Sequence, residues 1–299
     1  MTKQITKCRV CGNNDLQTVI NLGEQVLTSI SLFTKEQQIE SGPLELVRCV
    51  GGCGLVQLSH TFDRTKIYGD LYGYRSGVNR TMTKHLHDKV KNIQKFIKLK
   101  DGDVVIDIGS NDGTLLAAYP ENLNRVGIDP SGEKYRSLYA KGCELICDYF
   151  DPNTAIFFCK KKPKVITSIA MFYDLEDPMR FMKQVYELLD DDGIWVFEQS
   201  YMPAMLKNTS YDTICHEHLE YYGLAQIQWM AERNGMIIVD LEFNDSNGGS
   251  FCVTLAKAGS KFKPVNISKI LKSEKRLSFA KFSFDVWRQR VKLKDNIRK

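Results

Sequence analysis

Short apolar runs alternate with segments of helical periodicity between residues 103 and 257. Residues 132–141 and 178–189 are two of the helical segments, and each lies between two apolar runs. This alternation predicts a parallel sheet with helices on both faces. The last run follows Asn247-Gly-Gly-Ser250 after a short loop, which favours an antiparallel strand at one edge of the sheet. The predicted strands span residues 104–108, 125–128, 144–146, 165–169, 194–199, 237–243 and 251–256.

Two amphipathic stripes flank this region. Met82, Leu86, Val90 and Ile93 recur at steps of three and four within residues 79–98, which predicts a helix leading toward the first strand. A second stripe near the end of the chain predicts another helix with a polar face. Its apolar positions are Leu277, Ala280, Phe284, Trp287 and Val291.

The net charge of +5 is unevenly distributed. Residues 261–299 hold thirteen Lys and Arg against three acids, so the rest of the chain is net acidic. This balance argues against a nucleic-acid-binding surface. The basic excess indicates either a solvated helix face or a surface that docks a partner. Neither an apolar run of membrane-spanning length nor an apolar N-terminal stretch is present, so we expect a cytoplasmic protein without membrane contact.

Four cysteines occur in two close pairs near the N-terminus. The pairs are Cys8-Arg-Val-Cys11 and Cys49-Val-Gly-Gly-Cys53, and glycines follow or interrupt each pair. Two such turns can place four thiolates around one tetrahedral zinc ion, and a complete thiolate shell makes that ion structural. Two unrelated buried cysteine pairs, or a redox role for Cys8 and Cys11, are the alternatives.

A glycine-rich turn follows the first predicted strand of the central region. Asp107, Gly109, Asn111 and Gly113 form a DxGxNxG pattern that differs from the GxGxxG pattern of dinucleotide sites. A carboxylate here would repel a pyrophosphate but suits a ligand with an ammonium and a sulfonium group. The next two strands also end in acids, the second strand at Asp129 and the third at Asp148. The aromatic residue Tyr149 follows directly after Asp148. These strand ends predict a site for S-adenosylmethionine, with a dinucleotide as the alternative.

Two of the five histidines lie in the segment Cys215-His216-Glu217-His218, beyond the fifth predicted strand. A histidine next to a carboxylate can act as a general base whose orientation the acid controls. The alternative is that these histidines only satisfy structural hydrogen bonds.

Six motifs together resemble the zinc-containing, S-adenosylmethionine-dependent sugar C-methyltransferases, which act on nucleotide-linked ketosugars in deoxysugar and polysaccharide pathways. The resemblance spans roughly residues 8 to 257 and implies a class I methyltransferase fold, an α/β Rossmann-like sheet preceded by a zinc-binding domain. The motifs are the first cysteine pair, Cys49-Val-Gly-Gly-Cys53-Gly-Leu-Val-Gln-Leu58, Tyr72-Gly-Tyr74-Arg-Ser76, Asp107-Ile-Gly-Ser-Asn-Asp-Gly113, Tyr211-Asp-Thr-Ile-Cys-His-Glu-His218 and Asn247-Gly-Gly-Ser250.

The resemblance also implies a mechanism, namely base-assisted carbon methylation through an enolate. His218 matches the base of the family and Glu217 its acidic neighbour, with His216 completing the cluster. Tyr72 or Tyr74 would reach the substrate from the zinc-domain side. Tyr173 stands where the family commonly has a histidine.

Four positions depart from the family pattern and leave other acceptors open. They are Cys215 in place of a tyrosine, Ile169 and Tyr173 in the fourth-strand segment, and Asn247 in place of a histidine. Methylation of oxygen or nitrogen on a sugar or related metabolite is therefore the first alternative. A non-catalytic partner subunit that binds S-adenosylmethionine and zinc is the second, and the choice between monomer and homo-oligomer stays open.

We therefore expect three parts along the chain. Residues 1–75 form the zinc-binding domain, and residues 76–260 form the methyltransferase domain with its leading helix. Residues 261–299 form a basic helical segment that could open a further C-terminal domain of the kind the family usually carries.

Overall fold

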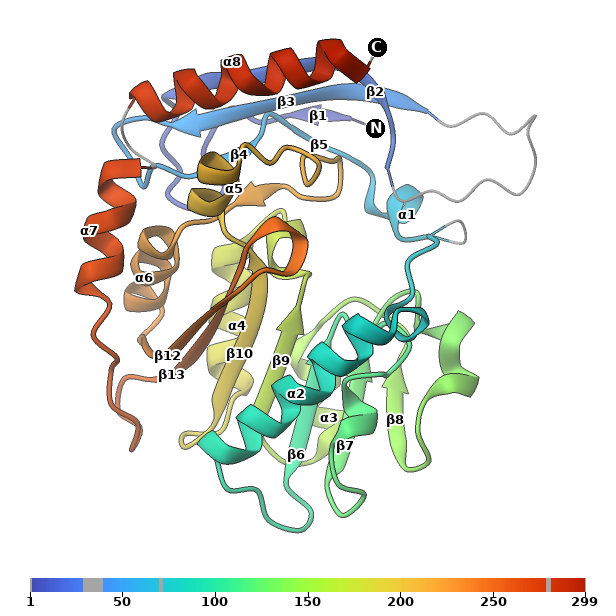
Figure 1. Ribbon diagram of the computed structural model, residues 1–299. Coiled ribbons are helices and arrows are strands. Elements are labelled where there is room, and N and C mark those ends of the chain that lie inside the picture. The colour runs from blue at the N-terminus through green and yellow to red at the C-terminus, as the bar shows by residue number, and fades with distance from the viewer. Residues whose placement is uncertain (1, 29–39, 70–71, 278–280, 299) are drawn as a thin grey trace.

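The computed structural model describes residues 2–28, 40–69, 72–277 and 281–298. Figure 1 shows two layers: a lower layer, in which helices flank a large sheet, and an upper layer with a smaller sheet. The first segment of the chain builds most of the upper layer, and the last helix returns to it. The two layers meet at the upper ends of the central strands, where the glycine-rich turn also lies.

The lower layer is a seven-stranded sheet in the order β12-β13-β10-β9-β6-β7-β8. Five neighbouring strands run parallel, whereas β13 pairs antiparallel with both β10 and β12. Each predicted strand is present, and its bounds differ from the prediction by one residue at most at either end. The strands are β6 (Val104–Ile108), β7 (Asn124–Ile128), β8 (Cys143–Ile146), β9 (Val165–Ile169), β10 (Ile194–Ser200), β12 (Met236–Asn244) and β13 (Ser250–Lys257).

Helices cover both faces of this sheet because its strands are apolar on both sides. On one face α2 (Arg80–Phe96) packs Leu86, Val90 and Ile93 against Val105 of β6. On the other face, side chains of three helices join one core cluster with Ile106 of β6. These helices are α3 (Pro152–Cys159), α4 (Pro178–Leu188) and α6 (Leu224–Arg233).

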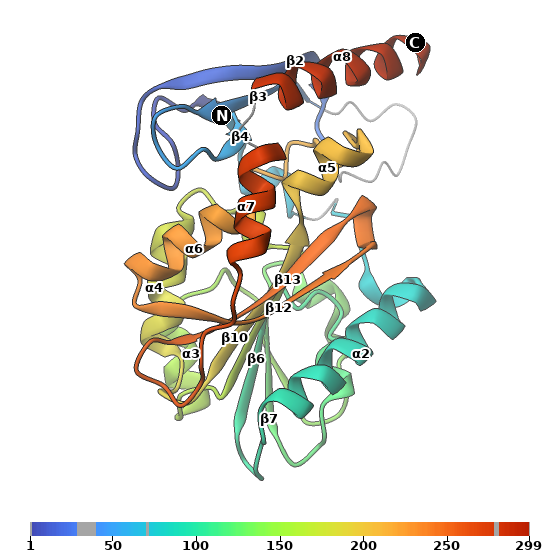
Figure 2. The ribbon, with the colours of Figure 1, turned by 60° about the vertical axis from the view of Figure 1, so that its left-hand side comes forward.

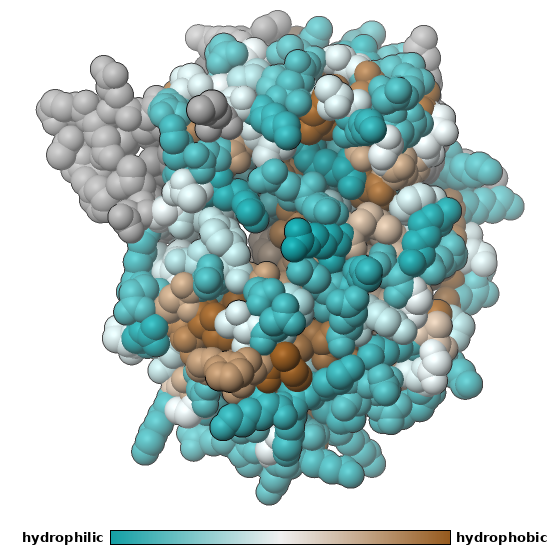
Figure 3. All heavy atoms as spheres, turned by 180° about the vertical axis from the view of Figure 1, so that it is seen from behind, coloured by the Kyte–Doolittle hydropathy of each residue, from teal (hydrophilic) through white to brown (hydrophobic). Residues whose placement is uncertain are grey.

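The second of these faces is turned away from the viewer in Figure 1. Seen from behind in Figure 3, the surface is mostly hydrophilic and carries a hydrophobic patch in its lower part. Phe157 of α3 is 83% exposed on this side of the sheet.

The predicted helix over residues 132–141 is instead a short 3₁₀ helix, η3 (Gly132–Leu138). Its end is fixed by Tyr139, whose hydroxyl donates to the Asn111 carbonyl at 3.0 Å and lies 2.7 Å from Ser110 Oγ. The ring of Tyr139 also lies against Gly113, where an added Cβ would come within 2.9 Å. These anchors beneath the glycine turn favour a tight turn over a regular α-helix.

The upper layer is a four-stranded sheet in the order β11-β4-β3-β2, with a two-stranded ribbon beside it. Three of its strands come from the first 60 residues, but the edge strand β11 (Glu220–Tyr221) follows His218 closely in the chain. The short helices α1 (Arg64–Ile67) and α5 (Met202–Asn208) complete this layer. The other strands are β1 (Lys3–Gln4), β2 (Leu16–Val26), β3 (Ser41–Cys49), β4 (Val56–Leu58) and β5 (His60–Thr61).

Two helices form the C-terminal segment, α7 (Ser268–Leu277) and α8 (Lys281–Arg298). Figures 1 and 2 show α8 lying along β2 and β3. Its apolar positions Phe284, Trp287 and Val291 are buried in the core cluster of the upper layer. Ala280, a position of the predicted stripe, lies outside the described residues.

The described positions of this stripe, Phe284, Trp287 and Val291, thus pack within this chain. The three-part division at residues 75 and 260 stays a proposal, to which the structure adds that β11 and α8 pack with the N-terminal strands. None of the described helices combines the length and the apolar composition that a membrane span needs.

Candidate active site and zinc centre

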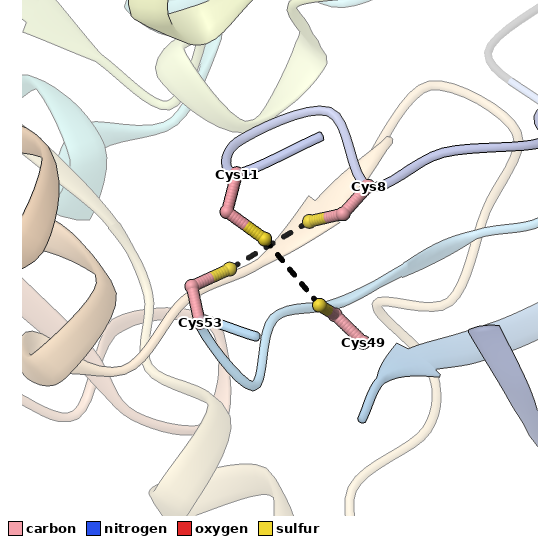
Figure 4. A group of neighbouring side chains, drawn as sticks. All are labelled: Cys8, Cys11, Cys49 and Cys53. Carbon is pink, nitrogen blue, oxygen red and sulfur yellow. Dashed lines mark hydrogen bonds between the residues drawn. The ribbon is translucent and has the colours of Figure 1, made fainter. Parts of the chain in front are cut away.

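The structure brings the four predicted cysteines together. The Sγ atoms of Cys8, Cys11, Cys49 and Cys53 all lie within 4.8 Å of one another. Figure 4 shows the four side chains converging, with Cys8 and Cys53 Sγ 3.6 Å apart and Cys11 and Cys49 Sγ 3.5 Å apart. Four thiolates around zinc, each at about 2.3 Å from the ion, are about 3.8 Å from one another. The cluster therefore fits one tetrahedral zinc ion.

A glycine makes room for these sulfurs. A Cβ atom on Gly52 would lie 2.6 Å from Cys49 Sγ and 2.8 Å from Cys11 Sγ, so a side chain there would displace both ligand atoms. In the first turn the Gly12 N–H donates to the Cys8 carbonyl at 2.9 Å with a φ of +74°, which favours glycine. Because four thiolates fill a tetrahedral shell, this zinc has a structural role.

A cavity of about 1180 Å³ opens at the carboxyl ends of β6, β7, β9 and β10, below the upper layer. It brings together most of the residues that the sequence singled out for cofactor binding and catalysis. Gly113 and His216 are not among its lining residues. The predicted residues that line it are Tyr72, Tyr74, Asp107, Gly109, Asn111, Asp129, Asp148, Tyr149, Tyr173, Glu217 and His218.

The glycine turn begins where β6 ends. Gly109 has a φ of +76° and donates its N–H to the Ile128 carbonyl at 2.8 Å, so the backbone turns back toward β7. Asp107, just before the turn, accepts a hydrogen bond from Thr167 Oγ1 at 2.6 Å. Burial raises the pKa of Asp107 to about 7, and the nearby charge of Asp129 adds to this rise.

Asn111, which lines the cavity, uses its side chain for hydrogen bonds within the chain. Its Oδ1 accepts from the Ser76 N–H at 2.9 Å, and its Nδ2 donates to the Tyr74 carbonyl at 3.1 Å. Next to it, Asp112 Oδ2 accepts from the Gly77 N–H at 2.8 Å. The two side chains hold the Tyr74–Gly77 loop over the cavity, a role for Asp112 that the sequence did not indicate.

Asp129 is buried and strongly hydrogen-bonded. Its Oδ2 accepts from the Asn111 N–H at 2.8 Å, and its Oδ1 accepts from the Ser131 N–H and hydroxyl at 2.7 and 2.6 Å. At the third strand end, the Arg64 guanidinium lies 4.7 Å from the ring centre of Tyr149. Arg64 belongs to α1, so the upper layer reaches this end of the cavity, which no local sequence signal could reveal.

His218 lies at the other end of the cavity. Its Nδ1 is 2.8 Å from the Thr213 carbonyl oxygen, and because a carbonyl carries no proton, Nδ1 must be the protonated nitrogen. Nε2 is then the basic nitrogen of the ring. Burial lowers the pKa of His218 to about 4, so the imidazole is neutral at physiological pH. The Tyr173 ring packs 4.1 Å from the imidazole, centre to centre.

His216 points away from the cavity. Its ring is fully buried, with Nε2 3.2 Å from the Gly42 carbonyl and an edge-on contact with Phe62 at 4.6 Å. Its backbone N–H donates to Thr28 Oγ1 at 3.1 Å. His216 therefore fastens this segment to the N-terminal strands.

Asp174 and Gln199 are among the further polar side chains that line the cavity and were not singled out from the sequence. Asp174 has a buried Oδ1 without a hydrogen-bond partner among the described residues. The side-chain amide oxygen and nitrogen of Gln199 are likewise buried without a partner there. Both residues follow or end a central strand, so their location at the carboxyl edge of the sheet was the one available signal.

The strand order, with the cofactor turn after β6 and an antiparallel β13, defines a class I S-adenosylmethionine-dependent methyltransferase fold. A family model described as "Methyltransferase domain" matches residues 78–241, and one described as "Putative zinc binding domain" matches residues 8–68. The first match covers more than half of the chain, so the chain belongs to this family of methyltransferase domains. Both cofactors expected from the sequence, S-adenosylmethionine and zinc, fit the residues described above.

Individual proteins are also similar to this chain. C-methyltransferase NovU of Streptomyces niveus is 28% identical over 268 residues, which cover 87% of this chain and 63% of NovU. The chain thus spans less than two thirds of that relative's length.

Solved methyltransferase structures are also similar to this chain, at lower identity. A methyltransferase from Clostridium acetobutylicum gives a TM-score of 0.46 at 14% identity, over 59% of this chain and 92% of that chain. Magnesium protoporphyrin IX methyltransferase from Synechocystis gives a TM-score of 0.45 at 16% identity, over 65% of this chain and 92% of that chain.

Proposed function

We propose that this protein catalyses S-adenosylmethionine-dependent methylation of a carbon atom next to the ketone of a nucleotide-linked sugar. The observation that carries the proposal is the orientation of His218, a neutral imidazole whose Nδ1–H is held by the Thr213 carbonyl in the wall of the cofactor cavity. The similarity to a C-methyltransferase supports carbon as the acceptor.

S-adenosylmethionine supplies an electrophilic methyl group on a positively charged sulfur. We assign its binding to the acids at the strand ends, Asp107, Asp129 and Asp148, because carboxylates attract its ammonium group and accept bonds from its ribose hydroxyls. Gly109 keeps the backbone beneath it free of side chains, and Tyr149 provides an aromatic surface.

His218 acts as the base in this proposal. The α-proton of a ketone is weakly acidic, so its removal needs a positioned base, and Nε2 is the nitrogen left to accept it. Glu217 lines the same cavity, and in this proposal its carboxylate would favour the imidazolium that forms when the proton arrives. The Tyr173 ring fixes the plane of the imidazole.

Tyr72 and Tyr74 would contact the sugar from the upper layer. Burial and the charge of Glu217 raise the pKa of Tyr72, so its hydroxyl stays protonated and can donate a hydrogen bond. Arg180 also lines the cavity and provides positive charge for the diphosphate of a nucleotide-linked substrate. Arg64 and Arg75 line it too, each paired with an acid, Glu176 and Asp112 respectively.

The proposal is tested with methyl-¹³C-labelled S-adenosylmethionine and a panel of nucleoside-diphosphate-linked 4-ketosugars. Label on a sugar carbon, detected by NMR of the product, is the expected result. Label on oxygen or nitrogen would replace the proposal with the alternative acceptor, and failure to methylate any ketosugar would overturn it. In His218→Ala we expect turnover to fall by about 10²–10⁴-fold. His87→Gln, at a histidine outside the cavity, is the matched control.

A further inference from the structure

Asp174 is a carboxyl group in the proposed catalytic end of the cavity that the mechanism above does not use. It ends the 3₁₀ turn η4 (Phe172–Asp174), directly after β9, and its backbone N–H donates to the Met171 carbonyl at 3.1 Å. The residue lines the cavity, but its Oδ1 atom is closed to solvent and has no hydrogen-bond partner among the described residues. An unpaired buried polar atom costs free energy unless it serves a ligand.

The groups that face Asp174 are acidic or phenolic. Glu217 and Glu220 approach from the segment before and in β11, and Tyr68 approaches from the end of α1. Within the described part of the chain, no Lys or Arg forms an ion pair with Asp174. Burial raises the pKa of Asp174 well above its ordinary value and the charge of Glu217 raises it further, whereas the nearby Tyr68 hydroxyl opposes part of this rise. Two carboxyls sharing a closed site cannot both ionise cheaply.

We propose that Asp174 takes part in the reaction as a neutral carboxylic acid that donates a hydrogen bond to the substrate's carbonyl oxygen as this becomes an enolate. The inference rests on the proposed carbon methylation. It assigns separate tasks to neighbouring groups, because His218 accepts the proton from carbon and Asp174 stabilises the oxygen.

The chemical step balances without any further reactant. The α-carbon–hydrogen bond breaks and its proton moves to His218 Nε2, while the electron pair forms the carbon–carbon double bond of the enolate. Negative charge then develops on the former carbonyl oxygen, where the O–H of Asp174 strengthens its hydrogen bond without transferring its proton. A donor at this point acts more strongly on the transition state than on the ketone, so it raises kcat.

The first test measures the protonation state directly and needs no substrate. Infrared spectra of the whole chain near pH 7.5 should contain a protonated carboxyl C=O band that is missing in Asp174→Asn. The exposed Asp101 is the matched control, and Asp101→Asn should leave this band in place. If the difference between wild type and Asp174→Asn shows only an ionised carboxylate, the proposal is overturned.

The second test asks whether a donor is needed. Asn keeps a neutral donor of similar shape, so Asp174→Asn should retain turnover within about tenfold, whereas Asp174→Ala should lose about 10²–10³-fold in kcat. The wild-type rate should decline at alkaline pH as Asp174 ionises, and Asp174→Asn should not show this decline. Thermal unfolding of each variant checks that it is folded.

Equal loss in Asp174→Asn and Asp174→Ala, or no loss in either, would overturn the donor role. These outcomes are distinct from failure of the proposed function, in which the wild-type chain itself methylates no ketosugar. In that case the infrared test still decides whether Asp174 is a neutral acid.

Discussion

Arg9, which lies between two zinc-ligand cysteines, has its Nε 3.7 Å from Oε1 of Glu220, two residues beyond His218. Both side chains are almost fully buried. The guanidinium also donates to the Leu58 carbonyl at 2.7 Å, and the Leu58 N–H donates to the Leu219 carbonyl at 2.9 Å. The zinc centre and the segment that carries His218 are therefore joined through side chains and through β-sheet hydrogen bonds.

This link predicts that Arg9 positions the catalytic segment. Arg9→Ala should lower the free energy of unfolding by about 3 kcal/mol, because it breaks a buried pair and leaves carbonyls without donors. It should also lower kcat more than it raises KM for S-adenosylmethionine, since the cofactor end of the cavity does not contact Arg9. Denaturant unfolding and steady-state kinetics measure the two effects. Arg136→Ala, at an exposed arginine, should change neither.

Zinc removal should destabilise the part of the upper layer that Arg9 links to the His218 segment. Chelation, or Cys11→Ser, should release one zinc ion per chain and lower the unfolding temperature, because the four thiolates hold together turns far apart in sequence. Metal analysis and thermal unfolding measure this. Cys159→Ser, at a cysteine outside the cluster, is the control and should keep the zinc. Full zinc retention by Cys11→Ser would contradict a four-thiolate site.

The sequence predicted features that depend on local spacing. A strand, a glycine turn and an acid at the strand end are close in the chain at residues 104–113, and acids also end the next two strands at Asp129 and Asp148. These three local signals together indicated the cofactor site. The cysteine pairs are likewise two local turns, each with its own glycine. These features could be predicted because each depends on residues that are close together in the sequence.

Features that depend on which segments meet in space were not predictable. His216 and His218 stand two positions apart, yet the chain bends at residues 216–217 and sends one ring toward Gly42 and the other toward the cavity. Arg64 reaches Tyr149 only because the two layers pack together. Asp174 became a candidate only once its neighbours were known to be acidic.

The pKa of Asp107 predicts how cofactor affinity depends on pH. Burial raises this pKa to about 7, and a cationic ligand favours the ionised form, so binding should release a proton. Affinity for S-adenosylmethionine should therefore weaken as the pH falls below 7, approaching tenfold per pH unit. Isothermal titration calorimetry in buffers of different ionisation enthalpy measures both effects. Asp107→Asn should bind more weakly and lose the pH dependence, and an unchanged dependence would contradict this assignment.

Protonation of His218 predicts a stability change at lower pH. Its folded-state pKa of about 4 lies below the ordinary value of 6.5, so the unfolded chain binds the extra proton first. This group's contribution to stability is complete above pH 6.5 and is lost as the pH falls toward 4, by about 1–3 kcal/mol. The free energy of unfolding, measured with denaturant between pH 4.5 and 7.5, should change less steeply with pH in His218→Gln than in the wild type. The same slope in both proteins would mean that another group titrates there.

The buried acid of the C-terminal segment, Glu274, predicts that this segment stabilises the methyltransferase layer. Its carboxylate accepts from the Leu224 and Ala225 N–H groups at 2.6 and 2.9 Å, at the start of α6, and from the Tyr201 hydroxyl at 2.7 Å. Glu274→Ala should therefore cost about 2 kcal/mol, because it leaves buried donors without an acceptor. Lys272→Ala, on the exposed face of α7, should lower the free energy of unfolding by a few tenths of a kcal/mol at most. Limited proteolysis should cut α7 and α8 first in Glu274→Ala, whereas equal resistance in both variants would mean that contacts of α8 alone hold the segment.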